Sequence, residues 1–256
     1  WLHRVIGRLI GVVFAVAFFV FLVFRKMPAR LAWRSLVLLV LGGLQGLIGW
    51  WMVSSGLSER VDVAPERLMI HLGLALLIFS GLIWTGLEAW SGQRYNRAPT
   101  GWSWGAALLL IGVFLQCLLG ALVAGSKAGM VYTDWPMMNG AVFPPVEWGQ
   151  GALTFLHDQG LVQFNHRIGA YILLVATTLY AVHAWRWRLA EGSAAGAYSL
   201  AAAVWLQAGL GVFTLIHAVP ITLGVLHQAV AAVVLGAATV NCWLVLRSSP
   251  RRFNSG

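Results

Sequence analysis

The sequence predicts an all-α integral membrane protein made of two pseudo-symmetric four-helix bundles, with seven transmembrane helices present in this chain. Three observations predict this fold. The 256 residues are 59% hydrophobic and only 10% charged, whereas soluble domains are about one quarter charged. The apolar residues recur in separate stretches along the chain, each close to the roughly 20 residues that cross a bilayer. Several segments of the first half also recur in the second half.

Each apolar stretch is expected to form one transmembrane helix, because about 20 helical residues span about 30 Å of hydrocarbon. The expected helices cover residues 5–24, 31–53, 67–89, 103–125, 163–185, 197–217 and 220–246. The longest connection, residues 126–162, is rich in Trp, Tyr, Met and Pro and has few charges. Such a loop could lie across the outer end of a helix bundle, or it could form an aromatic belt at the membrane interface. The composition alone does not distinguish these two interpretations.

The positive charges predict the orientation of the helices. If the helices alternate in direction, eleven basic residues share one side of the membrane: Arg25, Lys26, Arg30, Arg34, Arg94, Arg97, Arg186, Arg188, Arg247, Arg251 and Arg252. Arg60, Arg67 and Lys127 fall in loops on the other side. Loops rich in Lys and Arg stay in the cytoplasm. The formal net charge of +9 is therefore a topology signal, and we predict a lipid bilayer and no nucleic acid as partner.

An internal repeat predicts the domain organisation. WLHRVIGR (1–8) resembles QFNHRIGAY (163–171), LQGLIGWWMV (44–53) resembles LQAGLGVFTL (206–215), and RLMIHLGLAL (67–76) corresponds to TLGVLHQAVA (222–231). LQCLLGALVAG (115–125) is then the counterpart of a helix that precedes Trp1, so we expect the first of eight helices to be missing. The predicted parts are an N-terminal half, a cytoplasmic linker, a C-terminal four-helix half and a cytoplasmic tail, at residues 1–90, 91–101, 102–246 and 247–256.

Four of the seven histidines occupy corresponding places in the two halves: His3, His71, His166 and His227. A His within a bilayer is costly and normally faces a bundle interior or a cavity, and neutral imidazole is the commonest metal ligand. One turn beyond each is a small residue that leaves room for a flat macrocycle: Gly7, Ala75, Ala170 and Ala231. Two histidines per half suit six-coordinate haem iron. Zinc fits less well, because no Cys or carboxylate accompanies them.

The other polar residues of the spans have simpler interpretations. Arg4 and Arg167 each follow a repeated His, and we expect them to pair with haem propionates or with other protein groups. His157 is expected in the outer loop, and His183 and His217 as hydrogen-bonded helix contacts. No cysteine lies in an outer loop, so we predict no disulfide.

Five segments resemble the haem A synthase family (CtaA/Cox15), in its proteobacterial and mitochondrial type: WLHRVIGRLIG, GLQGLIGWWMVSSGL, AGMVYTDWPMMNG, VQFNHRIGAY and VPITLGVLHQA. Together they span nearly the whole chain. The resemblance implies conversion of haem O to haem A, in which the porphyrin C8 methyl is oxidised by successive hydroxylation to a formyl group. It implies a haem B cofactor on His166 and His227, and the haem O substrate at catalytic His3 and His71.

The resemblance also implies haem O synthase and cytochrome c oxidase assembly factors as partners. It implies a multi-pass protein of the bacterial inner membrane, or of the mitochondrial one in a eukaryote, with its haem sites toward the periplasmic side. The sequence identifies no electron donor. The residues alone leave two alternatives open. One is a dihaem b-type cytochrome that only passes electrons, and the other is a haem transporter or chaperone with exchangeable ligation.

Overall fold

The computed structural model describes residues 1–56, 61–91, 101–189 and 191–247. These ranges hold seven helices long and apolar enough to cross a membrane, so the predicted fold class is confirmed. They are α1 (Leu2–Val23), α2 (Ala29–Ser54), α3 (Pro65–Ser91), α4 (Gly101–Gly125), α6 (Gln159–Arg186), α7 (Glu191–Ile216) and α8 (Ile221–Arg247). Between α4 and α6 lie two 3-10 turns, η1 (Ala128–Met130) and η2 (Trp148–Leu153), and the short helix α5 (Thr154–His157).

Two of the predicted helices begin four or more residues earlier than expected. α6 begins at Gln159 rather than at 163, because the Asp158 side chain accepts a hydrogen bond of 2.7 Å from the backbone N–H of Leu161 and caps the helix. α7 begins at Glu191 rather than at 197, with an acidic residue in its first turn, where the helix dipole favours negative charge. Hydropathy marks only the part of a helix inside the hydrocarbon, so polar first turns escape it.

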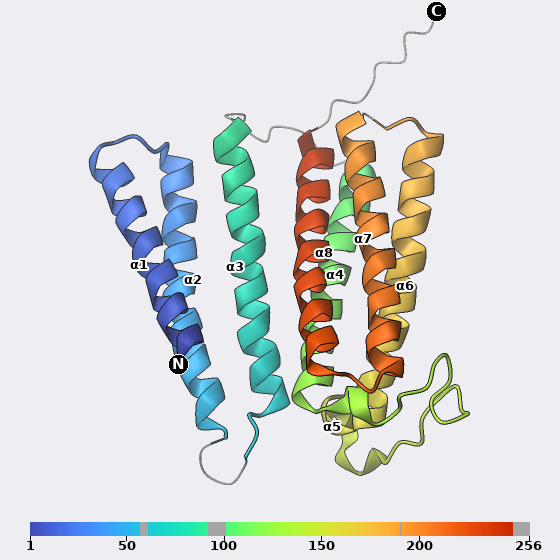
Figure 1. Ribbon diagram of the computed structural model, residues 1–256. Helices are drawn as coiled ribbons and strands as arrows, with labels where there is room; N and C mark the ends of the chain where they lie inside the picture. The colour runs from blue at the N-terminus through green and yellow to red at the C-terminus, as the bar shows by residue number, and fades with distance from the viewer. Residues whose placement is uncertain (57–60, 92–100, 190, 248–256) are drawn as a thin grey trace, which may run out of the picture.

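The C-terminal helices form a closed four-helix arrangement, in which α4 packs on α6, α6 on α7, α7 on α8 and α8 on α4. Their shared core contains Leu109, Val113, Leu173, Leu200 and Leu235. The remaining helices form a row beside this bundle, α1 against α2 and α2 against α3 (Figure 1). α3 contacts both α4 and α8 and thereby joins the two parts.

Small residues permit close approach between the helices of the row and the bundle. A Cβ placed on Gly81 of α3 would lie 2.8 Å from Cδ2 of Leu38 in α2. One placed on Gly125 would lie 2.9 Å from the Pro65 Cα at the start of α3. Helices in lipid gain little from hydrophobic burial against each other, so tight van der Waals packing over small residues is a main source of their association.

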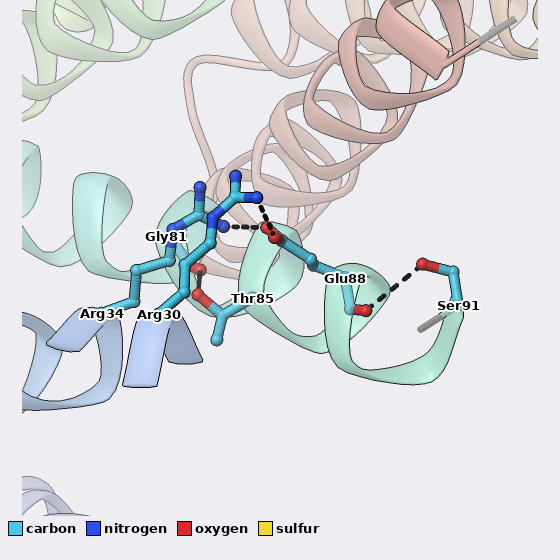
Figure 2. Close-up of polar contacts among 6 residues, drawn as sticks. All are labelled: Arg30, Arg34, Gly81, Thr85, Glu88 and Ser91. Atoms are coloured by element: carbon cyan, nitrogen blue, oxygen red, sulfur yellow. Dashed lines mark hydrogen bonds and ion pairs between the residues drawn. The ribbon is translucent and has the colours of Figure 1, made fainter. Parts of the chain in front are cut away.

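An ion-pair cluster fastens α2 to α3 at the end of the row that carries the basic turn between α1 and α2. The Glu88 carboxylate, 9% exposed, contacts a guanidinium nitrogen of Arg30 at 3.0 Å and one of Arg34 (Figure 2). In the same part of α3 the Thr85 hydroxyl donates to the Gly81 carbonyl oxygen at 2.7 Å. A buried carboxylate needs such cationic partners, because burial without them is costly.

Several sequence expectations lie outside the described residues or remain predictions. Arg60, Arg94, Arg97, Arg251 and Arg252 lie outside the described ranges, as do nearly all of the predicted linker (91–101) and tail (247–256). The division into halves at 1–90 and 102–246 remains a prediction. The loop expected at 126–162 ends earlier, because residues 159–162 belong to α6.

Candidate functional site

The four repeated histidines lie at one end of the molecule. Each is among the first eight residues of its helix: His3 in α1, His71 in α3, His166 in α6 and His227 in α8. These four helices all begin at the end drawn at the bottom of Figure 1, where the long loop between α4 and α6 also lies. The described basic residues of the predicted cytoplasmic side, such as Arg25 and Arg188, lie at the opposite end of the helices.

The His166 and His227 rings lie close together inside the C-terminal bundle. Their ring centroids are 6.5 Å apart and their planes make an angle of 77°. Both side chains are half-buried. Two imidazoles that share one metal ion, each through a bond of about 2 Å as in other histidine–metal sites, have ring centroids about 6 Å apart. The spacing of this pair therefore fits one iron atom held between two histidines.

A glutamine from the neighbouring helix contacts three of the four histidines in the same way. The side-chain nitrogen Nε2 of Gln116 in α4 donates to the His166 carbonyl oxygen at 2.8 Å and lies 3.1 Å from His166 Nδ1. Gln45 in α2 makes the same contacts with His71, at 3.0 and 3.3 Å. Gln207 in α7 donates to the His227 carbonyl oxygen at 3.0 Å and lies 3.2 Å from both nitrogens of that ring.

A glycine one turn beyond each glutamine makes room for the same imidazole. A Cβ on Gly120 would lie 3.3 Å from the Cε1 atom of His166. A Cβ on Gly49 would lie 2.9 Å from Cε1 of His71, and one on Gly211 would lie 2.9 Å from Cε1 of His227. Such distances are shorter than ordinary carbon–carbon contacts of about 3.5–4.0 Å. Each ring is thus held between an amide and a bare stretch of helix backbone.

The sequence alone assigns no role to these glutamines and glycines. The sequence feature that could have identified them is the motif Leu-Gln-x-x-x-Gly, which occurs at residues 44–49, 115–120 and 206–211. The first and third copies align the two halves, and the second lies within residues 115–125. A polar residue at the same place in three membrane spans indicates a shared task, but only the structure shows that the task concerns the histidines.

The pair in the first part of the chain is more open. His3 is exposed near the start of α1, whereas His71 is half-buried in α3. The described residues show no ring-to-ring contact between the two. Arg4, beside His3, is also exposed. The structure therefore brings the His166 and His227 rings into contact, whereas His3 and Arg4 in α1 are exposed.

Arg167, the residue after His166, fastens the long loop to the bundle. It is 9% exposed. One guanidinium nitrogen donates to the Met137 carbonyl oxygen at 2.9 Å, and the other donates to the Tyr132 carbonyl oxygen at 3.0 Å. Gln163 donates to the same Tyr132 carbonyl oxygen at 2.8 Å. The loop between α4 and α6 is thus anchored directly beside the His166–His227 pair.

A tight turn shapes the anchored loop. The Asp134 carboxylate accepts a hydrogen bond of 2.7 Å from the backbone N–H of Asn139. This bond is the main reason why the pKa of Asp134 lies below its usual value. Met138 and Ala141 pair through their backbones, and the Met138 side chain is 2% exposed. The indole N–H of Trp135 donates to the Tyr171 hydroxyl at 2.8 Å, a further link to α6.

The remaining histidines lie away from the repeated set. His157, in α5 within the loop, has Nδ1 3.1 Å from Oε1 of Gln150. The His183 ring packs 4.9 Å from the Trp102 ring. His217 contacts the Phe213 carbonyl oxygen through Nδ1 at 2.8 Å. Cys117 and Cys242 are free thiols, as predicted. Nowhere in the described ranges do three His, Cys, Asp or Glu side chains converge, as a structural zinc site requires.

The family model and the individual relatives that match this chain agree with each other. Residues 1–239 match the family model COX15-CtaA, described as a cytochrome oxidase assembly protein. The chain is 56% identical to a protein named heme A synthase from Caulobacter sp. (strain K31) and 57% identical to one of that name from Caulobacter vibrioides; each match covers 96% of this chain and 73% of the relative. A protein of the same name from Parvibaculum lavamentivorans is 45% identical over 93% of this chain and 68% of its own length.

Proposed function

This chain belongs to the COX15-CtaA family, and we propose that it is a haem A synthase, a membrane oxidoreductase that converts haem O to haem A. The observation that supports this most directly is the His166–His227 pair, with ring centroids 6.5 Å apart. That spacing fits bis-imidazole ligation of one iron atom. Haem B is the cofactor that we assign to this pair, as the family resemblance implies.

Arg167 supports a ligand with negative charge at the same place. Its guanidinium is buried, and its partners are backbone carbonyl oxygens rather than a carboxylate. Its Nε atom is buried and has no hydrogen-bond partner within the described part of the chain. Haem carries two propionates, and Arg pairs readily with carboxylates. We assign the free Nε–H of Arg167 to a propionate, while its two terminal nitrogens keep the loop in place.

The protein's own contribution is to bind the haem groups, to orient them and to enclose them. His166 and His227 hold the cofactor, and the loop anchored by Arg167 and Gln163 restricts access of water from that end. A bound haem supplies the one-electron and oxygen chemistry that amino-acid side chains lack. The oxidation of the haem O methyl group to a formyl group by successive hydroxylation would take place in the first half, with electrons relayed through the second half.

His3 and His71 are the residues that we assign to the haem O substrate in the first half. The open position of His3 suits a substrate that enters and leaves, whereas the closed pair in the second half suits a resident cofactor. We assign Arg4 to a substrate propionate. We place the protein in the bacterial inner membrane with the histidine end toward the periplasm, because basic residues such as Arg25 and Arg188 lie at the other end.

The test is to purify the protein from membranes that make haem O, extract the haems and identify them by chromatography. We expect haem B together with haem O or haem A. The variants His166→Ala and His227→Ala should lose haem B, whereas the matched control His183→Phe, away from the pair, should keep it. Haem B alone in both halves would instead support a dihaem cytochrome that only transfers electrons. A wild-type protein without haem B would contradict the proposal.

A further inference from the structure

Gln45, Gln116 and Gln207 are polar side chains inside membrane helices that the proposed function does not use. Each has its amide oxygen, Oε1, buried and without a hydrogen-bond partner in the ranges that the structure describes. Buried polar atoms normally find a partner, because leaving one unpaired costs about 1–3 kcal/mol. The same unpaired oxygen beside a histidine on three different helices points to a partner that the histidine supplies.

We propose that these three glutamines are positioning residues that set the orientation and the protonated nitrogen of the haem-binding histidines, each within a Leu-Gln-x-x-x-Gly unit. This inference rests on the proposed function, because it requires that the histidines bind haem iron. Gln116 and Gln207 act on the two ligands of the C-terminal half. Gln45 acts on His71 in the N-terminal half.

The chemistry of imidazole explains why an amide suits this position. A neutral histidine that binds a metal through Nε2 carries its proton on Nδ1, and that N–H usually donates to an acceptor beyond the metal. Gln116 Nε2 lies 3.1 Å from His166 Nδ1, so the amide is already at that nitrogen. A half-turn of the amide about its last side-chain bond would exchange the hydrogen bond that Nε2 donates to the His166 carbonyl oxygen for one in which Oε1 accepts from Nδ1–H.

His227 differs in detail from the other two histidines. Gln207 Nε2 is 3.2 Å from both of its ring nitrogens, so Cε1 points toward the glutamine. Rotation of the ring about Cβ–Cγ would leave Nδ1 with Gln207 and free Nε2 to hold a bound haem. The bond from Gln207 to the His227 carbonyl oxygen, 3.0 Å, keeps the amide over this histidine. The structure therefore places the Gln207 amide beside the His227 ring.

The glycine of each unit completes the arrangement. Gly120, Gly211 and Gly49 lie four residues after the glutamines, on the same helix face and against Cε1 of the same ring. A side chain there would push the ring away from the helix that carries the glutamine. On the His166 side, a Cβ at Gly169 would also collide with Oε1 of Gln116. Glycine is thus found where the amide and the imidazole need to approach closely.

The test uses the full-length, haem-loaded protein and the variants Gln207→Leu and Gln207→Glu, with the same pair at Gln116. We measure the midpoint potential of the C-terminal haem and the low-spin ferric electron paramagnetic resonance spectrum. A hydrogen bond from Nδ1–H to an acceptor makes the imidazole a better donor and stabilises ferric iron. We expect a more positive potential for leucine and a more negative one for glutamate, with haem affinity about 10–100-fold lower for leucine.

If the glutamine had a merely structural role, both variants would shift the midpoint potential in the same direction. Shifts in opposite directions would therefore support the inference. The control is Thr178→Val, which removes the 3.0 Å hydrogen bond from the Trp205 indole N–H between α6 and α7 without touching a histidine. It should leave potential and spectrum unchanged. The inference is overturned if the Leu and Glu variants shift the potential alike or no more than Thr178→Val, or if Gln207→Glu loses haem as Gln207→Leu does. Absence of a bis-histidine spectrum in the wild type would instead overturn the proposed function.

Discussion

Replacing Gly211 by alanine should displace the His227 ring, whereas the same change at Gly209 should be harmless. A Cβ on Gly211 would lie 2.9 Å from His227 Cε1, 3.5 Å from Nδ1 and 3.7 Å from Nε2. Since carbon atoms pack at about 3.5–4.0 Å, the ring has to retreat by roughly 0.6 Å or more. Overpacking of this kind costs about 1–3 kcal/mol, which corresponds to about a 5–150-fold loss of haem affinity.

Gly209 is a matched control, because it lies on the same helix and a Cβ there would meet no atom of the described residues within 4 Å. Alanine is the better helix former by up to about 1 kcal/mol, so Gly209→Ala should be as stable as the wild type or slightly more so. The assay is the rate at which haem passes from each purified variant to an excess of a haem-scavenging apoprotein, followed by absorbance. Equal rates for Gly211→Ala and Gly209→Ala would refute the steric reasoning.

Three further changes test other parts of the structure. Glu88→Gln should lower the free energy of unfolding in detergent by about 1–2 kcal/mol, because it removes the charge-assisted contacts between the buried carboxylate and two partly exposed arginines; unchanged stability would argue against this cluster as a link between α2 and α3. Arg167→Met should speed hydrogen exchange of residues 131–141, since it removes two charge-assisted bonds of about 1.5–3 kcal/mol each; exchange as slow as in the wild type would show that the loop is held by other contacts. The backbone N–H of Asn139 lowers the pKa of Asp134 below its unfolded value, so the turn should be stabilised at neutral pH and loosen as pH falls through the folded-state pKa. Asp134→Asn should abolish that acid dependence in hydrogen exchange corrected for intrinsic rates, and an unchanged acid transition would contradict it.

The number and order of the membrane helices were predictable from the sequence. The length of an apolar stretch and the positions of basic residues are local features of a sequence. In a lipid bilayer they fix the number of membrane-spanning helices and their orientation. The first residues of the helices were less predictable, because a helix continues through polar turns that hydropathy does not mark. Asp158 and Glu191, at the starts of α6 and α7, are examples. The four repeated histidines were also predictable, since a polar residue at matching depth in two halves is rare enough to be noticed.

The contacts of those histidines were not predictable. Arg167 was expected to pair with a propionate or with another protein group. In the structure two of its nitrogens donate to loop carbonyl oxygens, and its buried Nε–H has no partner among the described residues. That outcome depends on where residues 132 and 137 fold back over α6, across about 30 positions of chain. No local sequence pattern predicts such a long-range contact.

The sequence by itself determined a membrane protein of apolar helices in which four histidines occupy corresponding places, because hydrophobic length, charge placement and an internal repeat are properties of residue order. Only the tertiary structure decided that the ring centroids of His166 and His227 lie 6.5 Å apart and that a glutamine from the neighbouring helix lies on three of the four histidines. The physical reason is that both facts depend on how helices rotate and approach one another. That approach is limited by side-chain volume at single positions such as Gly211, where the absence of one carbon lets an imidazole reach the backbone.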